Sequence, residues 1–247
     1  MIQLPSEPRV VSKEGNKAVF EIGPLYPGYG MTVGNSLRRV LISSLEGAAI
    51  TSAKIKGVSH EFSAIPGILE DMIEIILNLK KIRLRLFSSE PVTVMLNFKG
   101  VGEVTAGDIK ATSGIEIVNP EQRIATVTDK KTELEMELTI EKGVGYIPAE
   151  QHQKDKLTVG QIAIDGIFTP IKNVNFTVEN IRVGQRTDYN KILLDVETDG
   201  SVSPEEALKQ ASQILIEHFS VINTIEIPKE EKKEETKLKR GRKKKAE

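Results

Sequence analysis

The chain has 247 residues, 34 Lys plus Arg and 35 Asp plus Glu, giving a formal net charge of −1, and it has no cysteine. This length allows one or two domains with cores that need no disulfide or metal. The absence of Cys excludes thiolate zinc sites and Cys nucleophiles, and His60, His152 and His218 lack metal-ligand spacing. The longest uncharged stretch, 22–37, contains four Gly and two Pro. We therefore expect a cytoplasmic protein with no membrane segment and no signal peptide.

Charge is unevenly distributed along the chain. Residues 229–247 contain ten Lys or Arg and five Glu, whereas the other 228 residues hold 24 basic and 30 acidic groups. With almost no large apolar side chain, this basic tail is predicted to be disordered. It is either a solubilising end or an arm that touches nucleic acid without sequence preference. The candidate DNA contacts in the tail are Lys239, Arg240, Arg242 and Lys243.

The N-terminal region predicts two strands, over 9–12 and 17–22, followed by an irregular loop over 23–30. A helix is expected next, capped by Asn35 or Ser36. Its apolar positions recur at helical spacing and are Leu37, Val40, Leu41 and Leu45.

A strand over 50–58 precedes a second predicted helix, which Pro66 opens. Glu70 and Asp71 fall in its early turns, where the helix dipole favours negative charge. Its sequence is apolar over more than half of the helix circumference, which predicts burial between layers.

The central part of the chain has a β pattern. Residues 82–87 and 92–98 are predicted to be paired strands. In the strand over 134–141, apolar and polar residues alternate, so one face of the strand should be exposed to solvent. Further strands are expected over 115–118, 124–128, 174–183 and 191–198.

The last predicted helix has the clearest start signal, with Ser203 as cap, Pro204 first in the helix and Glu206 three residues after the cap. Its apolar seam steps by three and four through Leu208, Ala211, Leu215, His218 and Ile222, and Phe219 widens it. Such a seam either packs on its own domain or meets a second chain. The predicted fold class is therefore α+β, mostly antiparallel.

Three features of the sequence are candidates for binding or catalytic chemistry. The glycine-rich stretch 28–34 matches neither a dinucleotide fingerprint nor a P-loop, and it is expected to be a turn allowing close approach to a helix. Asp195, Glu197 and Asp199 share one face of a predicted strand. Three such carboxylates could bind a metal ion, but they are more typical of a surface exposed to solvent. His60 and its neighbour Glu61 point to opposite strand faces. With no catalytic constellation, the sequence favours a scaffold without cofactor.

Beyond these patterns, the segment GYGMTVGNSLRRVLISS at 28–44 closely resembles the signature of the bacterial RNA polymerase alpha subunit family. Further blocks that resemble the family occur in family order at 60–62, 70–80, 143–149, 182–191 and 197–207.

The resemblance implies a discontinuous dimerisation domain over 1–46 and 171–228, a sheet with two helices. A β-rich domain over 47–170 is inserted in it, and the basic tail over 229–247 follows. The family's role is assembly: two alpha chains dimerise and receive the beta and beta-prime subunits, which carry the nucleotidyl transfer. The isolated chain should therefore be inactive.

The resemblance also places contact residues. The beta subunit would meet Gly34, Asn35, Arg38, Arg39 and Ser43, with Arg39 the most sensitive. Other large-subunit contacts would be Lys80, Ile164, Arg182, Arg186 and Asp188, although Lys80 suits equally well an ordinary cation at a helix C-terminus. The homodimer interface would include Leu37, Leu41, Leu208, Leu215 and Phe219.

Typical family members continue through a linker into a small helical domain that binds promoter DNA. This sequence stops at Glu247, so DNA contact is expected mainly through the assembled enzyme. Two rival functions remain open: a free-standing nucleic-acid-binding protein that uses the basic tail, and a nucleotide-binding enzyme that uses the glycine-rich stretch.

Overall fold

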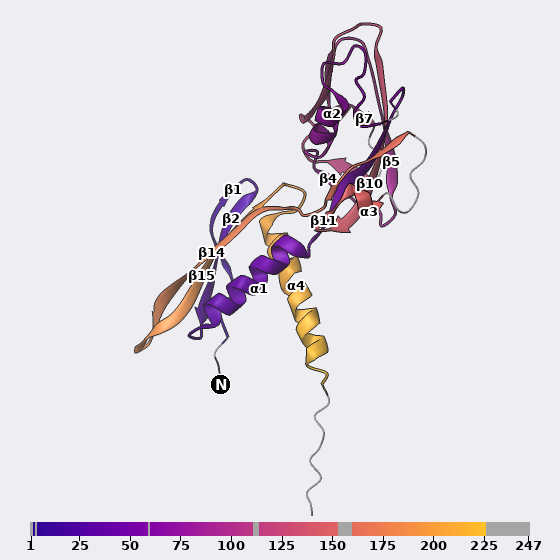
Figure 1. The fold of residues 1–247 in the computed structure, drawn as a ribbon. Coiled ribbons are helices and arrows are strands. Elements are labelled where there is room, and N and C mark those ends of the chain that lie inside the picture. Colours follow the sequence, from indigo (N-terminus) through magenta and orange to yellow (C-terminus); the bar gives the residue numbers. More distant parts are fainter. Residues whose placement is uncertain (1, 3, 59, 111–113, 153–159, 226–247) are drawn as a thin grey trace, which may run out of the picture.

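The computed structural model describes residues 2, 4–58, 60–110, 114–152 and 160–225. The predicted α+β class is confirmed, because antiparallel sheets dominate and few helices accompany them (Figure 1). The basic tail, with Lys239, Arg240, Arg242 and Lys243, lies outside the described residues.

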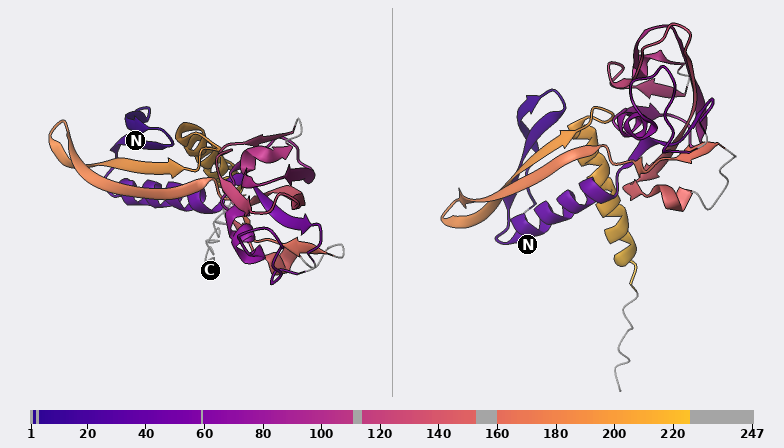
Figure 2. Two further views of the ribbon diagram at one scale, coloured as in Figure 1. Left: turned by 90° about the horizontal axis from the view of Figure 1, so that it is seen from above. Right: turned by 45° about the horizontal axis from the view of Figure 1, so that its top comes forward.

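The elements form two units joined end to end (Figure 2). The outer unit is a four-stranded antiparallel sheet with two helices on it. Its strands lie in the order β1 (Arg9–Glu14), β2 (Lys17–Leu25), β15 (Arg186–Thr198) and β14 (Ile171–Val183). Its helices are α1 (Tyr29–Ser43) and α4 (Pro204–Ile222). Their buried side chains form one core with the sheet, which includes Phe20, Leu41, Leu194 and Ala211.

The inserted unit comprises the elements from β3 to β13 and has a core of its own. Its main sheet has the order β7 (Ile109–Lys110), β5 (Val92–Lys99), β10 (Glu133–Val144), β3 (Glu46–Ile55), β4 (Leu84–Leu86) and β8 (Ile115–Ile117), with β12 (Gln161–Ala163) also on β3. Two small pairs complete it, β6 (Gly102–Thr105) with β9 (Arg123–Val127) and β11 (Tyr146–Ile147) with β13 (Gly166–Ile167). Its helical segments are α2 (Met72–Leu79), the 3-10 turn Ala106–Asp108 and α3 (Ala149–His152).

The predicted pairing of strands 82–87 and 92–98 is wrong. β4 pairs with β3 and β8, whereas β5 pairs with β10 and β7. The long strand β10 forms extensive ladders with both β5 and β3, so it separates β5 from the short strand β4. The alternation predicted for β10 is confirmed, since Leu134, Met136, Leu138 and Ile140 are all buried and the residues between them are partly exposed.

Helix α1 starts earlier than predicted, so neither Asn35 nor Ser36 caps it. Gly28 occupies the cap position with a φ of 85° and supplies no side chain. Asn190 of β15 replaces that side chain, because its Oδ1 accepts hydrogen bonds from Gly28 N at 2.9 Å and Gly30 N at 3.3 Å. A residue distant in sequence thus satisfies amide groups that helix starts leave free.

Only Gly28 of the glycine-rich stretch lies in a turn, and the rest of the stretch, including Gly30 and Gly34, belongs to helix α1. A Cβ atom at Gly30 would come within 2.6 Å of Val178, and one at Gly34 would come within 2.6 Å of the Phe176 ring. The two glycines therefore let the helix backbone lie directly on β14.

Helix α2 starts after Asp71, whose side chain accepts a hydrogen bond from Glu74 N at 2.7 Å. Pro66 therefore precedes the helix, and the predicted start is wrong. The predicted burial between two layers is also wrong for one side of α2. Met72 and Ile75 are buried, but Ile73 is 42% exposed and Leu77 is 50% exposed.

Helix α4 begins as predicted. Ser203 Oγ accepts a hydrogen bond from Glu206 N, and the Glu206 carboxylate accepts one from Ser203 N at 3.2 Å. Ala207 and Ala211 in the first half of α4 are fully buried. The second half projects beyond the sheet (Figure 1) and leaves large apolar side chains in solvent.

Candidate subunit-contact surfaces

The outward face of α1 is a mixed apolar and basic surface. Met31 and Ile42 are 55% and 45% exposed, and Asn35, Arg38 and Arg39 are exposed between them. Within the part of the chain that the structure describes, neither guanidinium has a hydrogen bond or an ion pair. Unpaired arginines beside exposed apolar groups are typical of surfaces that bind another protein.

The remaining residues predicted to contact beta divide between the two sides of α1. Ser43 is exposed and its hydroxyl donates to the Arg39 carbonyl at 2.7 Å. Gly34 is buried against Phe176, so it positions the helix from beneath.

A second exposed surface lies on the inserted unit, and the sequence pattern does not predict it. Leu69, Ile73 and Leu77 recur every four residues and are 68%, 42% and 50% exposed, and Phe62 nearby in sequence is 76% exposed. We call Leu69, Ile73 and Leu77 the α2 ridge, which starts just before the helix and continues along it. A helix that is apolar all round gives no sequence signal for which side faces solvent, so only the structure separates the ridge from the core.

Lys80 follows α2 and forms an ion pair with Asp165, with 2.6 Å between Nζ and Oδ2. The Asp165 carboxylate also accepts a hydrogen bond from Ala149 N at 2.8 Å. The bond from Lys80, followed by that from Ala149, lowers the pKa of Asp165. Ile164 is the sequence neighbour of Asp165, so the structure brings the predicted contacts Lys80 and Ile164 close together. The Ile164 side chain is only 1% exposed and is therefore not accessible to a partner.

The end of the β14–β15 hairpin carries a compact charged and aromatic group. Arg186 makes a bidentate pair with Asp188 at 3.0 and 2.7 Å, which lowers the pKa of that carboxyl. Its guanidinium also lies 5.7 Å from the ring centre of Tyr26 and 5.5 Å from that of Tyr189. Arg182 is exposed and donates to a backbone carbonyl two residues further on. These predicted contact residues therefore lie together on one exposed tip.

The five predicted dimer residues differ in exposure. Leu37, Leu41 and Leu208 are at most 8% exposed and belong to the outer unit's own core. Leu215 is partly buried, and Phe219 is 61% exposed. A direct contact with a second chain is therefore available mainly through the second half of α4.

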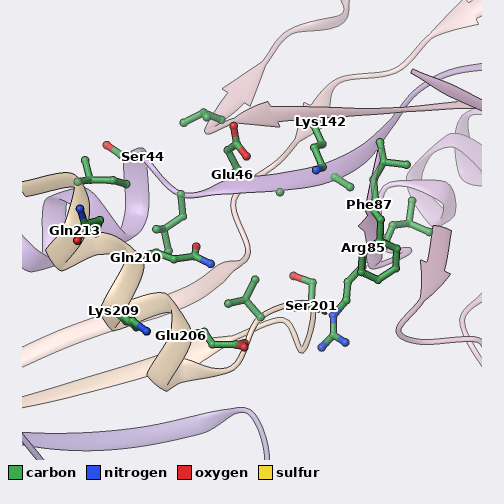
Figure 3. Close-up of a pocket in the computed structure, with 18 residues that line it drawn as sticks. Ser44, Glu46, Arg85, Phe87, Lys142, Ser201, Glu206, Lys209, Gln210 and Gln213 are labelled. Carbon is green, nitrogen blue, oxygen red and sulfur yellow. Dashed lines mark hydrogen bonds between the residues drawn. The ribbon is translucent and has the colours of Figure 1, made fainter. Parts of the chain in front are cut away.

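A groove of about 920 Å³ runs between the first half of α4 and the near end of the inserted sheet (Figure 3). Its apolar lining includes Leu45, Leu84, Leu86, Val144, Val202 and Ile214. Its polar rim carries charges of both signs, on Glu46, Arg85, Lys142, Glu206 and Lys209.

Two candidate ligand sites from the sequence have structural partners instead. Gly30 and Gly34 pack on β14 as described, and the amides of Gly28 and Gly30 donate to Asn190 Oδ1. Asp195 forms an ion pair with Lys17 at 3.0 Å, and Asp199 Oδ2 lies 3.8 Å from Arg83 Nε. No group of three metal-binding side chains occurs among the described residues. None of the described helices is both long and apolar enough to cross a membrane.

Comparison with known proteins shows the family to which the chain is related. The family described as RNA polymerase Rpb3/RpoA insert domain matches residues 53–169. The protein named DNA-directed RNA polymerase subunit alpha from Moorella thermoacetica is 52% identical over 223 residues, covering 88% of this chain and 71% of the relative. The same-named protein from Alkaliphilus oremlandii is 48% identical over 249 residues, covering 95% of this chain and 78% of the relative. The chain belongs to the bacterial RNA polymerase alpha subunit family.

The extent of the match to alpha subunits varies between relatives. The alpha subunit of Roseiflexus sp. (strain RS-1) is 51% identical over 213 residues, and the chain spans only 65% of its length. The α2 ridge, Lys80 and Ile164 fall within the match to the insert domain, whereas α1 and α4 lie outside it. The resemblance noted in the sequence is thus confirmed over both units of this alpha-family chain.

Proposed function

We propose that this chain is a homodimeric assembly scaffold of bacterial DNA-directed RNA polymerase, acting in the cytoplasm. It receives the beta and beta-prime subunits and contributes no catalytic residue of its own. The observation that carries this proposal is the identity of 48% and 52% to proteins named DNA-directed RNA polymerase subunit alpha, over 95% and 88% of this chain.

The proposed dimer forms through the second half of α4. Ile216, Phe219 and Ile222 are 58%, 61% and 59% exposed, and they recur at spacings of three along the helix. Burial of a large apolar side chain contributes about 1.5–3 kcal/mol, so covering this surface with a second copy would be strongly favourable. Exposed apolar groups gathered on one helix are typical of an interface.

Beta would bind the outward face of α1. Arg39 is the proposed anchor, because its guanidinium has no partner among the described residues and projects from a rigid helix. A planar guanidinium pairs well with a carboxylate or carbonyl of another chain. Arg38 lies about 100° away around the helix and would contribute less.

Beta-prime would bind near Lys80 and Ile164. The hairpin tip of Arg182, Arg186 and Asp188 would be a further contact with a large subunit. The α2 ridge gives the inserted unit a further apolar surface for a large subunit. Because Lys80 is already paired with Asp165, its role combines a contact surface with support of the loop that carries Asp165.

The proposed domain division is 1–46 with 171–228, and 47–170. Two separate apolar cores support it, one for each unit. Positions 226–228 lie outside the described residues. DNA would be met through the assembled polymerase, and a direct contact by the basic tail would add only salt-sensitive affinity.

Copurification tests this function against its rivals. A tagged chain, expressed in its own organism, should retain two very large polypeptides after washing. Capture of nucleic acid without these polypeptides would favour the free-standing nucleic-acid-binding protein. A purified chain that carries bound nucleotide and no large partner would favour the enzyme, and either result would contradict the scaffold.

A further inference from the structure

The two units touch sparingly outside the chain segments that connect them. No described helix or strand of the outer unit packs extensively on one of the inserted unit. For units joined in this way, relative motion is the default expectation. Specific hydrogen bonds or ion pairs between the units would therefore restrict this motion.

One such tie starts from Arg85 of β4 in the inserted unit. Its Nη2 donates to the carbonyl of Gly200 at 3.0 Å, and its Nε donates to the carbonyl of Ser201. Both carbonyls belong to the turn that precedes α4 in the outer unit. Hydrogen bonds from a charged guanidinium are about twice as strong as neutral ones, and its rigid fork fixes their direction.

A second tie comes from Arg83, whose Nε lies 3.8 Å from Asp199 Oδ2 in the same turn. The Asp199 side chain is 8% exposed, so water screens this attraction weakly. Asp199 Oδ1 in turn accepts from Ser201 N at 2.8 Å and Ser201 Oγ at 2.5 Å. The carboxylate therefore holds the turn in the shape that Arg85 binds.

The turn is also held from two other sides. Gly200 has a φ of 95°, and a Cβ there would lie 2.8 Å from Asn16 Nδ2 and 3.1 Å from Val118 Cγ1. Asn16 belongs to the outer unit and Val118 to the inserted unit, so the turn fits between them. Asp199 N donates to the Pro170 carbonyl at 2.9 Å, where the chain returns from the inserted unit.

We propose that Arg83 and Arg85 form a latch that fixes the angle between the outer and inserted units. The groove of Figure 3 lies beside this latch, and both Arg85 and Ser201 line it. The latch thus sets the groove width and also the spacing between the face of α1 and the α2 ridge. This inference concerns the shape of the chain and stands apart from the proposed function.

The absence of cysteine makes a direct distance measurement practical. Thr177→Cys on β14 and Thr93→Cys on β5 would place one spin label on each unit, at exposed strand positions. Labelled chain is mixed with an excess of unlabelled chain, so that a dimer holds at most one labelled copy. Pulsed electron paramagnetic resonance then gives the distribution of distances between the units.

Four substitutions are compared in this labelled background. Arg85→Ala and the double change with Arg83→Ala remove the cross-unit bonds, and Arg85→Lys keeps the charge but loses the fork. Glu116→Ala is the matched control, because Glu116 pairs with Arg85 Nη1 at 3.2 Å within the inserted unit. Circular dichroism checks that each variant is folded.

The latch predicts a broad, shifted distance distribution for the double variant, a smaller change for Arg85→Lys and no change for Glu116→Ala. An unchanged distribution in the folded double variant would overturn the proposal. Equal broadening by Glu116→Ala would also overturn it, because the cross-unit bonds would then not be what holds the angle. If the double variant does not fold, the single Arg85 variants decide by the same criteria.

Discussion

Substitution of Arg39 separates folding from assembly. The side chain is exposed, and its guanidinium has no partner among the described residues. Removal of such a side chain changes the free energy of unfolding by about 0.5 kcal/mol or less. Alanine is also the best helix former. We therefore expect Arg39→Ala to melt at nearly the unchanged temperature and to remain dimeric.

Binding to beta should respond much more strongly. Arginine anchors at protein interfaces often contribute about 2 kcal/mol or more, which corresponds to about a 30-fold weaker Kd. The assay is titration of immobilised beta subunit with the folded dimer, and thermal melting and light scattering are performed on the same sample.

Arg38→Ala is the matched control, since it removes the same group from the next position of the same exposed helix. Its effect on beta binding should be clearly smaller. An Arg39→Ala variant that is unfolded or monomeric would make the residue structural. Unchanged affinity for beta in a folded dimer would remove Arg39 from the contact surface.

Three further substitutions test other parts of the structure. Gly34→Ala places a methyl group 2.6 Å from the Phe176 ring, so chemical denaturation should show a loss of about 1–3 kcal/mol; unchanged stability would refute the close helix–sheet contact. Phe219→Asp should yield folded monomers by light scattering, because the side chain is 61% exposed in one protomer and an unpaired charge in an interface is costly; a persistent dimer would move the interface elsewhere. The pKa of Asp165 is lowered in the folded chain, mainly by the hydrogen bond from Lys80. The ionised carboxylate therefore stabilises the fold at pH values above its unfolded pKa, and this stabilisation is lost as the pH falls through the lower folded pKa. Asp165→Asn should flatten that acid part of a pH–melting profile, and an identical acid profile would contradict the pairing.

Local signals in the sequence predict part of the fold well. The start of α4 is encoded within four residues, Ser203 to Glu206, and the alternation of β10 follows from the strand alone. These predictions hold because the groups that satisfy each other are neighbours in the chain.

The errors occur where distant residues decide. Helix α1 begins at Tyr29 because Asn190 supplies the acceptor that Gly28 lacks, and no local pattern contains that information. The exposed side of α2 is hidden in an apolar sequence for the same reason. The pairing of β4 depends on β3 and β8, which lie on either side of it only in the folded sheet.

The contact residues show a similar division. The resemblance to the family selected Arg39 and Lys80 from their motifs, and both have some exposed surface. It could not indicate that Lys80 pairs with Asp165, or that Ile164 and Leu41 are enclosed in cores. The exposure of a side chain depends on how the chain packs. A motif therefore predicts which segment contacts a partner more reliably than it predicts which side chains do.

The central claim is that a dimer of this chain receives the two large subunits. Native mass spectrometry of the chain mixed with purified beta and beta-prime from the same organism tests it most directly. The account predicts a dimer when the chain is alone and, with both partners, one complex that contains two copies of this chain and one of each large subunit. A chain that stays monomeric, or a dimer that leaves beta and beta-prime unbound, would contradict the account.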